Sequence, residues 1–185
     1  MSSVIDAVVF IIDALARLYL LVLLLRLFLP WVRADFHNAL AQAILKLTSP
    51  LVVPVRRVLP PIGRIDTATV VVAFGIQYLT VFVIALIQGI HPRIVPLIIT
   101  SCIELALLTL NLFFWLTIIR IILSWVGGGA YNPAIAMISA LTEPVLRPFR
   151  RLIPPIGGFD ISPVFALIAL GALMRLVIGL RVFAL

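Results

Sequence analysis

The sequence is poor in charged residues and in the residue types that most enzymes use for chemistry. Only 11% of its 185 residues are charged, whereas ordinary soluble domains have about 25%. It has one cysteine, Cys102, and two histidines. A single cysteine has no partner for a disulfide within the chain. This composition excludes an ordinary soluble domain and a disulfide-stabilised scaffold.

Catalytic signatures are missing as well. The chain contains no Cys-x-x-Cys, no His-Glu-x-x-His, no Gly-x-Ser-x-Gly and no phosphate-binding Gly-x-x-x-x-Gly-Lys-Ser/Thr pattern. The topology derived below places His37 and His91 on opposite sides of a membrane, which rules out a metal or haem site that uses both. We therefore expect no catalytic residue, no metal and no cofactor, and we predict that the protein is not an enzyme.

Long apolar segments are what the sequence has instead. Hydrophobic residues make up 64% of the chain, and the mean hydropathy is +1.29. A membrane-spanning helix needs about 20 mainly apolar residues. Four segments meet this requirement, at about 4–29, 67–90, 94–123 and 162–181. The predicted fold class is an all-α membrane protein with four transmembrane helices.

A pattern rich in proline and arginine occurs twice. It reads T-x-P-x-x-x-P-x-R-R-x-x-P-P-I-G-x-x-D at residues 48–66 and again at 142–160, an offset of 94 residues, with 10 of 19 positions identical. The same offset pairs Arg26 with Arg120. Agreement over so long a pattern indicates an internal repeat.

We therefore divide the chain into a first repeat at 1–93 and a second at 94–185, each with two spans. The halves then have the same orientation, related by a pseudo-twofold axis along the membrane normal. The repeated positions that define the motif are Thr48, Pro50, Pro54, Pro60, Pro61, Gly63 and Asp66 in the first copy and Thr142, Pro144, Pro148, Pro154, Pro155, Gly157 and Asp160 in the second.

This doubled motif, with apolar helices around each copy, resembles the YggT family of small bacterial membrane proteins over essentially the whole chain. Departures between the two copies are minor: Ser49 is replaced by Glu143, and Val53 by Arg147. The family has been connected with osmotic-stress tolerance and potassium homeostasis, with cell division or nucleoid organisation and, in plastid relatives, with cytochrome assembly. The resemblance therefore implies a fold more firmly than an activity.

Each repeat is predicted to contain a short amphipathic helix, at about 36–47 and about 133–142, lying on the membrane surface. We expect these helices to stop at Pro50 and Pro144, because successive prolines forbid a regular helix and favour extended backbone. The Pro/Arg segment then forms a re-entrant loop. Asp66 and Asp160 are expected to cap the helices that follow.

The basic residues predict the orientation. Positively charged residues favour the cytoplasmic side of a membrane, and most of them collect around the two motif loops: Arg26, Arg33, Lys46, Arg56, Arg57 and Arg64 in the first repeat and Arg120, Arg147, Arg150 and Arg151 in the second. The opposite side has only Arg93 and Arg181. We predict a bacterial inner-membrane protein with cytoplasmic motif loops and periplasmic termini. The net charge of +7 then reflects topology, so no nucleic-acid partner is expected.

Two interpretations of the motif arginines stay open. In the first, Arg56, Arg57, Arg147, Arg150 and Arg151 bind anionic lipid headgroups or a partner. In the second, they only fix topology around a structural turn. Lipid is the expected partner, with a homo-oligomer or another membrane protein as alternatives.

A few polar residues fall inside the predicted spans, where they are functional candidates by default. Helical periodicity and depth group Asp13, Arg17, Glu104, Asn111 and Arg175 in one interior cluster, with Asp6 and Gln77 as further candidates. Arg26 and Arg120 point away from it and are expected to snorkel toward the headgroups. The cluster is either a charge-paired core or an ion or substrate pathway.

Three functions fit the sequence. The first is a non-enzymatic membrane protein that lends tolerance to osmotic or ionic stress through its cytoplasmic Arg/Pro surface. The second is a potassium or proton channel or transporter that uses the intramembrane charges. The third is an assembly or scaffold factor for cell division or cytochrome machinery.

Overall fold

The computed structural model describes residues 2–31, 39–63, 65–126, 132–152 and 160–183, which are almost entirely helical. Its helices are α1 (Ser2–Phe28), α2 (Ala39–Arg56), α3 (Thr67–Ile87), α4 (Ile94–Val126), α5 (Pro133–Leu152), α6 (Ser162–Gly179) and the 3₁₀ helix η1 (Leu180–Phe183). No strand occurs among the described residues; the single isolated bridge pairs Ile62 with Ile65.

Four of these helices, α1, α3, α4 and α6, are long and apolar enough to cross a membrane. The predicted fold class and the four predicted spans are therefore confirmed in number and order. The boundaries differ slightly, since α3 ends at Ile87 and α4 extends to Val126. Beyond α3 the chain turns at Gly89, whose φ of +75° is accessible to glycine at little cost.

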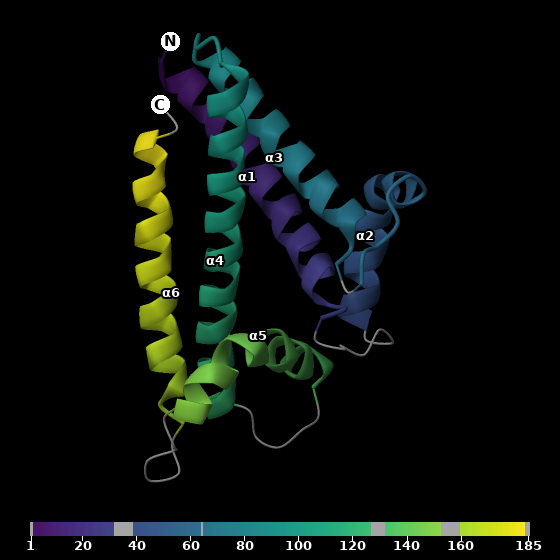
Figure 1. Cartoon of the computed structure of the whole chain (residues 1–185), viewed down its shortest axis with the longest axis vertical. Helices are drawn as coiled ribbons and strands as arrows, with labels where there is room; N and C mark the ends of the chain where they lie inside the picture. The colour runs from purple at the N-terminus through teal and green to yellow at the C-terminus, as the bar shows by residue number, and fades with distance from the viewer. Residues whose placement is uncertain (1, 32–38, 64, 127–131, 153–159, 184–185) are drawn as a thin grey trace.

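The helices form two similar units (Figure 1). Helix α1 packs along α3, and α4 packs along α6. Helices α2 and α5 lie at one end of the molecule, α2 against α1 and α3, and α5 against α4 and α6. The start of α1 and the end of α6 lie together at the other end. This arrangement agrees with two tandem repeats of the same orientation.

The two units meet in a shared apolar core near α2 and α5. Its buried residues come from α1 and the turn after it, and from α2, α4 and α5: Leu24, Leu29, Ala41, Ile44, Leu112, Leu116, Met137 and Leu141. Elsewhere the spans leave large apolar side chains exposed, such as Phe10 and Leu15 on α1. Such surfaces suit contact with lipid tails, whereas a second buried cluster, within the first unit, joins α1, α2 and α3.

Helices α2 and α5 do not stop at Pro50 and Pro144, as the proline pattern led us to expect. α2 continues through Pro50 and Pro54, and α5 through Pro144 and Pro148. A proline frees the carbonyl four residues earlier, which lies on the same helix face. All four prolines are exposed, so each freed carbonyl faces the outside instead of the core. Proline pairs at four-residue spacing are therefore tolerated here.

Candidate functional site

The first copy of the motif surrounds the guanidinium of Arg26, which comes from the last turn of α1 and is only 3% exposed. Its Nη1 donates to the hydroxyl of Thr48 at 2.7 Å and to that of Ser49 at 3.3 Å, both on α2. The same nitrogen lies 3.4 Å from the carbonyl oxygen of Leu45. Arg26 therefore does not snorkel as expected, because α2 supplies acceptors that satisfy it in the interior.

A buried carboxylate completes this first network. Asp66, just before α3, is 4% exposed. Its Oδ2 lies 3.8 Å from Nε of Arg26 and accepts a hydrogen bond from Arg56 and another from Thr69 at 2.7 Å. Because Arg26 is on α1, Arg56 on α2 and Thr69 on α3, the network connects all three helices of the first repeat.

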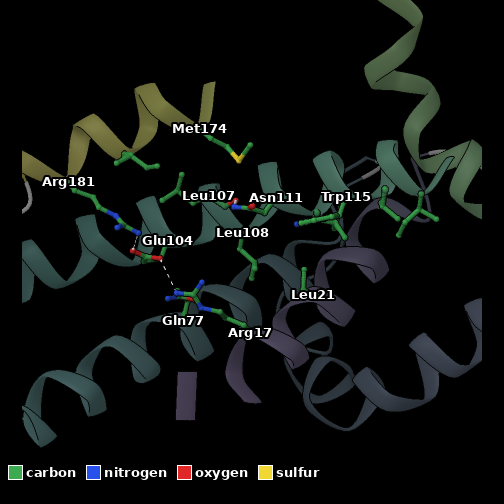
Figure 2. Close-up of a pocket in the computed structure, with 14 residues that line it drawn as sticks. Arg17, Leu21, Gln77, Glu104, Leu107, Leu108, Asn111, Trp115, Met174 and Arg181 are labelled. Carbon is green, nitrogen blue, oxygen red and sulfur yellow. Dashed lines mark hydrogen bonds and ion pairs between the residues drawn. The ribbon is translucent and has the colours of Figure 1, made fainter. Parts of the chain in front are cut away.

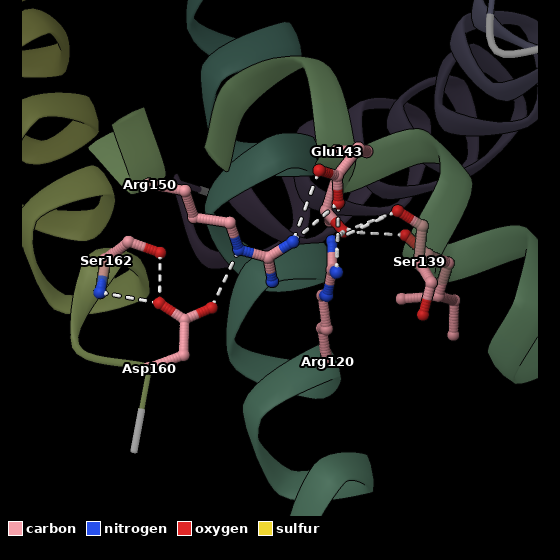
Figure 3. A network of polar contacts seen from close by, with 8 residues as sticks. Arg120, Ser139, Glu143, Arg150, Asp160 and Ser162 are labelled. Atoms are coloured by element: carbon pink, nitrogen blue, oxygen red, sulfur yellow. Dashed lines mark hydrogen bonds and ion pairs between the residues drawn. The ribbon is translucent and has the colours of Figure 1, made fainter. Parts of the chain in front are cut away.

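The second copy builds the equivalent network around Arg120 of α4 (Figure 3). Nη1 of Arg120 donates to the hydroxyl of Thr142 at 2.8 Å and to the carbonyl oxygen of Ser139 at 3.1 Å. Its Nη2 donates to Glu143 at 3.1 Å. Arg120 and Thr142 correspond to Arg26 and Thr48 at the repeat offset of 94 residues.

Arg150 then links Glu143 to Asp160 in this second network. Nη1 of Arg150 donates to Glu143 Oε2 at 2.9 Å, and its Nε donates to Asp160 Oδ2 at 2.8 Å. The other oxygen of Asp160 accepts the backbone N–H of Ser162 at 3.0 Å. Figure 3 shows the continuous path from Arg120 through Glu143 and Arg150 to Asp160.

The two motif aspartates differ in how they meet the following helix. Asp66 occupies the N-cap position of α3 but makes no capping hydrogen bond to the helix backbone. Asp160 does bond the first turn of α6, although the N-cap residue is Ile161. The predicted capping role is therefore wrong for Asp66, whose carboxylate instead turns toward arginine and threonine, and holds in part for Asp160.

Both aspartates favour the ionised form. Burial raises the pKa of Asp66, but hydrogen bonds from Arg56 and Thr69 outweigh this effect and hold the pKa below its ordinary value. Burial likewise raises the pKa of Asp160, while hydrogen bonds from Ser162 and Arg150 lower it further than burial raises it. Each carboxylate is therefore a fixed negative charge at neutral pH.

The five arginines predicted to bind lipid or a partner fall into two groups. Arg56 and Arg150 are ion-paired to the motif aspartates. Arg57, Arg147 and Arg151 are exposed, and their side chains make no hydrogen bond or ion pair with the described part of the chain. Only these three, named here the exposed arginines, leave their guanidinium groups available to a ligand.

A separate cavity of about 540 Å³ lies between the spans (Figure 2). Most of its lining is apolar, and the polar residues that line it are Arg17, Gln77, Glu104, Asn111 and Arg181. Arg17 and Arg181 approach Glu104 from different helices, α1 and η1. The structure thus brings together Arg17, Glu104 and Asn111 of the predicted interior cluster, along with Gln77.

Ion pairs neutralise the charges at this cavity. Arg17 pairs with Asp13 at 2.7 Å and lies 3.9 Å from Glu104, which also accepts a hydrogen bond from Arg181. The amide nitrogen of Asn111 donates to the carbonyl of Leu107 at 2.9 Å, within its own helix. Two acids and two arginines form a balanced set.

Arg175 was predicted to complete this cluster, but it is exposed on α6 and does not line the cavity. Arg181, six residues further along the chain, occupies that role. Six residues rotate a helix by about 240°, so a residue chosen by depth alone can lie on the wrong face. Asp6 is also exposed and outside the cavity. Of the motif residues, Pro154, Pro155 and Gly157 lie outside the described residues.

The sequence matches a known protein family. The CCB3/YggT family model matches it twice in tandem, over residues 5–87 and 99–181. The chain belongs to the CCB3/YggT family. Each match begins in the first span of one repeat and ends in or just beyond its second, so the family unit coincides with the structural repeat.

Relatives of this YggT-family chain include three bacterial proteins named as uncharacterized. One from Pseudomonas aeruginosa is 44% identical over 94% of this chain and 89% of its own length. YggT of Escherichia coli K12 is 34% identical over 89% of this chain and 86% of its own. A Vibrio alginolyticus protein is 39% identical over 87% of this chain and 88% of its own length. No solved structure matches the chain.

Proposed function

We propose that this YggT-family protein is a non-catalytic protein of the bacterial inner membrane that supports tolerance to osmotic and ionic stress. It does so by holding anionic lipid headgroups at the end of the molecule formed by α2 and α5. Both termini are periplasmic, and both motif loops are cytoplasmic, where anionic lipids attract basic segments by about 1 kcal/mol for each arginine or lysine.

One observation carries this proposal. In each copy of the motif, the first arginine of the Arg-Arg pair is ion-paired within the protein, and the second is exposed and has no hydrogen bond or ion pair to any described residue. A purely structural motif needs only the paired arginine. The repeated presence of a free guanidinium at Arg57 and Arg151 supports a role in binding, since guanidinium groups bind phosphate oxygens in a bidentate manner.

The experiment compares two double variants that remove the same charge. Arg57→Gln/Arg151→Gln removes exposed arginines from the motif end. Arg93→Gln/Arg175→Gln removes two exposed arginines elsewhere, again one from each repeat. We expect the first variant to lose enrichment of phosphatidylglycerol in mixed-lipid nanodiscs by tenfold or more and to fail to restore growth at high osmolarity in a strain that lacks the protein.

The control variant should keep both properties, and adding Arg147→Gln to the first variant should weaken lipid enrichment further. Equal lipid enrichment and equal growth for the two double variants would overturn the proposal. Membrane insertion is measured in parallel, so that loss of the protein is not mistaken for loss of binding.

The cavity favours a second candidate, transport of a small ion. Its charged residues lie in an otherwise apolar surface between spans from both repeats. Under this candidate, purified protein in liposomes carries a potassium or proton flux, and Glu104→Gln abolishes it. The absence of flux under either gradient removes this candidate.

A further inference from the structure

The two motif networks differ at the residue that follows the motif threonine. In the second repeat this residue contacts both arginines of its network. There, the carboxylate of Glu143 lies between Arg120, at 3.1 Å, and Arg150, at 2.9 Å. The equivalent residue of the first repeat is Ser49. Its hydroxyl accepts from Arg26 at 3.3 Å and makes no bond to Arg56. Because Ser49 has no carboxylate, the first network lacks a negative charge that bridges its two arginines.

The charge balance differs accordingly. In the second repeat, two arginines meet two carboxylates, those of Glu143 and Asp160. In the first repeat, Arg26 and Arg56 share a single carboxylate among the described residues, that of Asp66. The first network thus carries one more positive charge than the second, and its central guanidinium is only 3% exposed. A buried charge is costly unless it is paired and hydrogen-bonded.

Unpartnered polar atoms mark the same place. Nε of Arg26 and Oδ1 of Asp66 are both buried and lack a hydrogen-bond partner within the described part of the chain. Every buried guanidinium N–H ordinarily finds an acceptor. The first repeat therefore combines an excess positive charge with a buried guanidinium whose hydrogen bonding is incomplete on the side of Asp66.

We infer that the first repeat binds a phosphate group beside Ser49, between Arg26 and Arg56, in the position that the carboxylate of Glu143 fills in the second repeat. A phosphate supplies the missing negative charge together with several acceptor oxygens, and arginine pairs are suited to it. The headgroup of an anionic phospholipid and a free phosphate ion both provide this chemistry.

The surroundings of Ser49 allow such a group to enter. Ser49 is half-buried and the side chain of Arg56 is 44% exposed, so neither residue is closed off from a ligand that approaches from outside. Lys46 is exposed three residues before Ser49, which places it on the same helix face. In the second repeat this position is Ala140. The extra cation at the entrance of the first site again favours an anion.

This site goes beyond the proposed function, because it uses residues other than the exposed arginines. The two proposals can therefore fail separately. If Arg57→Gln/Arg151→Gln changes nothing while Ser49→Glu abolishes phosphate binding, the site stands and the proposed surface role falls. The opposite pattern of results leaves the surface role and removes the site.

The test exchanges the two residues between the repeats. Thermal unfolding of the full-length protein in neutral detergent is followed while inorganic phosphate is added, and bound phosphatidylglycerol is counted by native mass spectrometry. We expect the wild type to bind one phosphate group. Ser49→Glu should weaken binding at least tenfold because it supplies its own anion, and Ser49→Ala should stay within about threefold of the wild type.

The reciprocal change, Glu143→Ser, should create a second site, so that added phosphate restores stability that this variant loses in phosphate-free buffer. If Glu143→Ser does not fold, the comparison of Ser49→Glu with Ser49→Ala still decides. Stabilisation by inorganic phosphate with no retained lipid identifies a free anion as the ligand; one retained phosphatidylglycerol that phosphate displaces identifies a headgroup. The inference is overturned if neither probe binds the wild type, or if Ser49→Glu and Ser49→Ala respond alike.

Discussion

Asp66→Asn and Asp160→Asn remove the same charge from equivalent positions, yet we predict very different losses of stability. Asp66 is the only carboxylate of its network in the part of the chain that the structure describes. Its side chain is 5% exposed and lies 3.8 Å from the buried guanidinium of Arg26. Asp160 has a side chain that is 39% exposed, and its partner Arg150 keeps Glu143 as a second acid.

The magnitudes follow from this difference in burial. Removing one partner of a buried ion pair costs about 3–5 kcal/mol, because the other charge stays buried without compensation. Arg56 is 44% exposed and can turn to solvent, so we expect the lower end, about 3 kcal/mol, for Asp66→Asn. An exposed pair contributes about 0–1 kcal/mol, which is the loss expected for Asp160→Asn.

The assay is reversible unfolding of the purified protein in detergent, with the helical signal followed by circular dichroism. About 3 kcal/mol corresponds to a change in the unfolding equilibrium of roughly a hundredfold. Equal losses for the two variants would refute the claim that burial of Arg26 sets the energetics of the first network. A larger loss for Asp160→Asn would refute it more strongly.

Three further predictions concern pH, the cavity and one turn. The pKa values of both motif aspartates are lowered in the folded protein. Their contribution to stability is therefore complete above the unfolded-state pKa of about 3.9 and is lost as the pH falls through the folded-state values. Unfolding temperatures measured from pH 7 to pH 2 should show this loss, and the double variant Asp66→Asn/Asp160→Asn should show less of it. Glu104→Gln should lower stability by about 1–3 kcal/mol, since two arginines lose a charged acceptor, whereas Arg175→Gln should change it by about 0.5 kcal/mol or less; both are measured by the same unfolding assay. Gly89→Ala should cost about 1–2 kcal/mol, because the positive φ strains a residue with a Cβ while the surrounding space is open.

Each of these has a contrary result. An acid transition identical in the wild type and the double Asn variant would contradict the proposed linkage. A loss on Arg175→Gln as large as on Glu104→Gln would restore Arg175 to the interior cluster. An unchanged or raised stability of Gly89→Ala would show that the turn after α3 relaxes without strain.

The fold was largely predictable from the sequence because its signals are long and repeated. Four apolar segments define the four spans, and a motif duplicated at a constant offset defines the two units. The failure at Pro50 and Pro144 is local. Proline ordinarily disrupts a helix interior, but here the four-residue spacing keeps the freed carbonyls on the exposed face.

The polar sites were less predictable, because burial depends on packing between helices. The sequence identified Arg26 and Arg120 as repeated but placed them near the headgroups, since nothing in one helix reveals that Thr48 or Thr142 will lie beside them. The two arginines are 94 residues apart, and so are the two threonines. This common offset is the sequence signal that links each arginine to its threonine. The division of the Arg-Arg pairs into a bound and a free member also depends on the path of the chain to the motif aspartate.

Arg181 was missed for a geometric reason. The distance of a residue from the helix ends gives its depth in the membrane, but it does not give the face of α6 that meets α4. Because α6 ends at Gly179 and η1 follows it, the direction of Arg181 also depends on a change of helix type that the apolar pattern does not indicate.

The central claim is that the two copies of the motif present equivalent free guanidinium positions on the same, cytoplasmic side of the membrane. It is tested most directly by placing single cysteines at Arg57 and Arg151 in a Cys102→Ala background and treating intact cells with a membrane-impermeant thiol reagent, before and after the inner membrane is opened. The account predicts that both positions stay unlabelled in intact cells and become labelled once the cytoplasm is accessible. Labelling of one position and not the other in intact cells would contradict it.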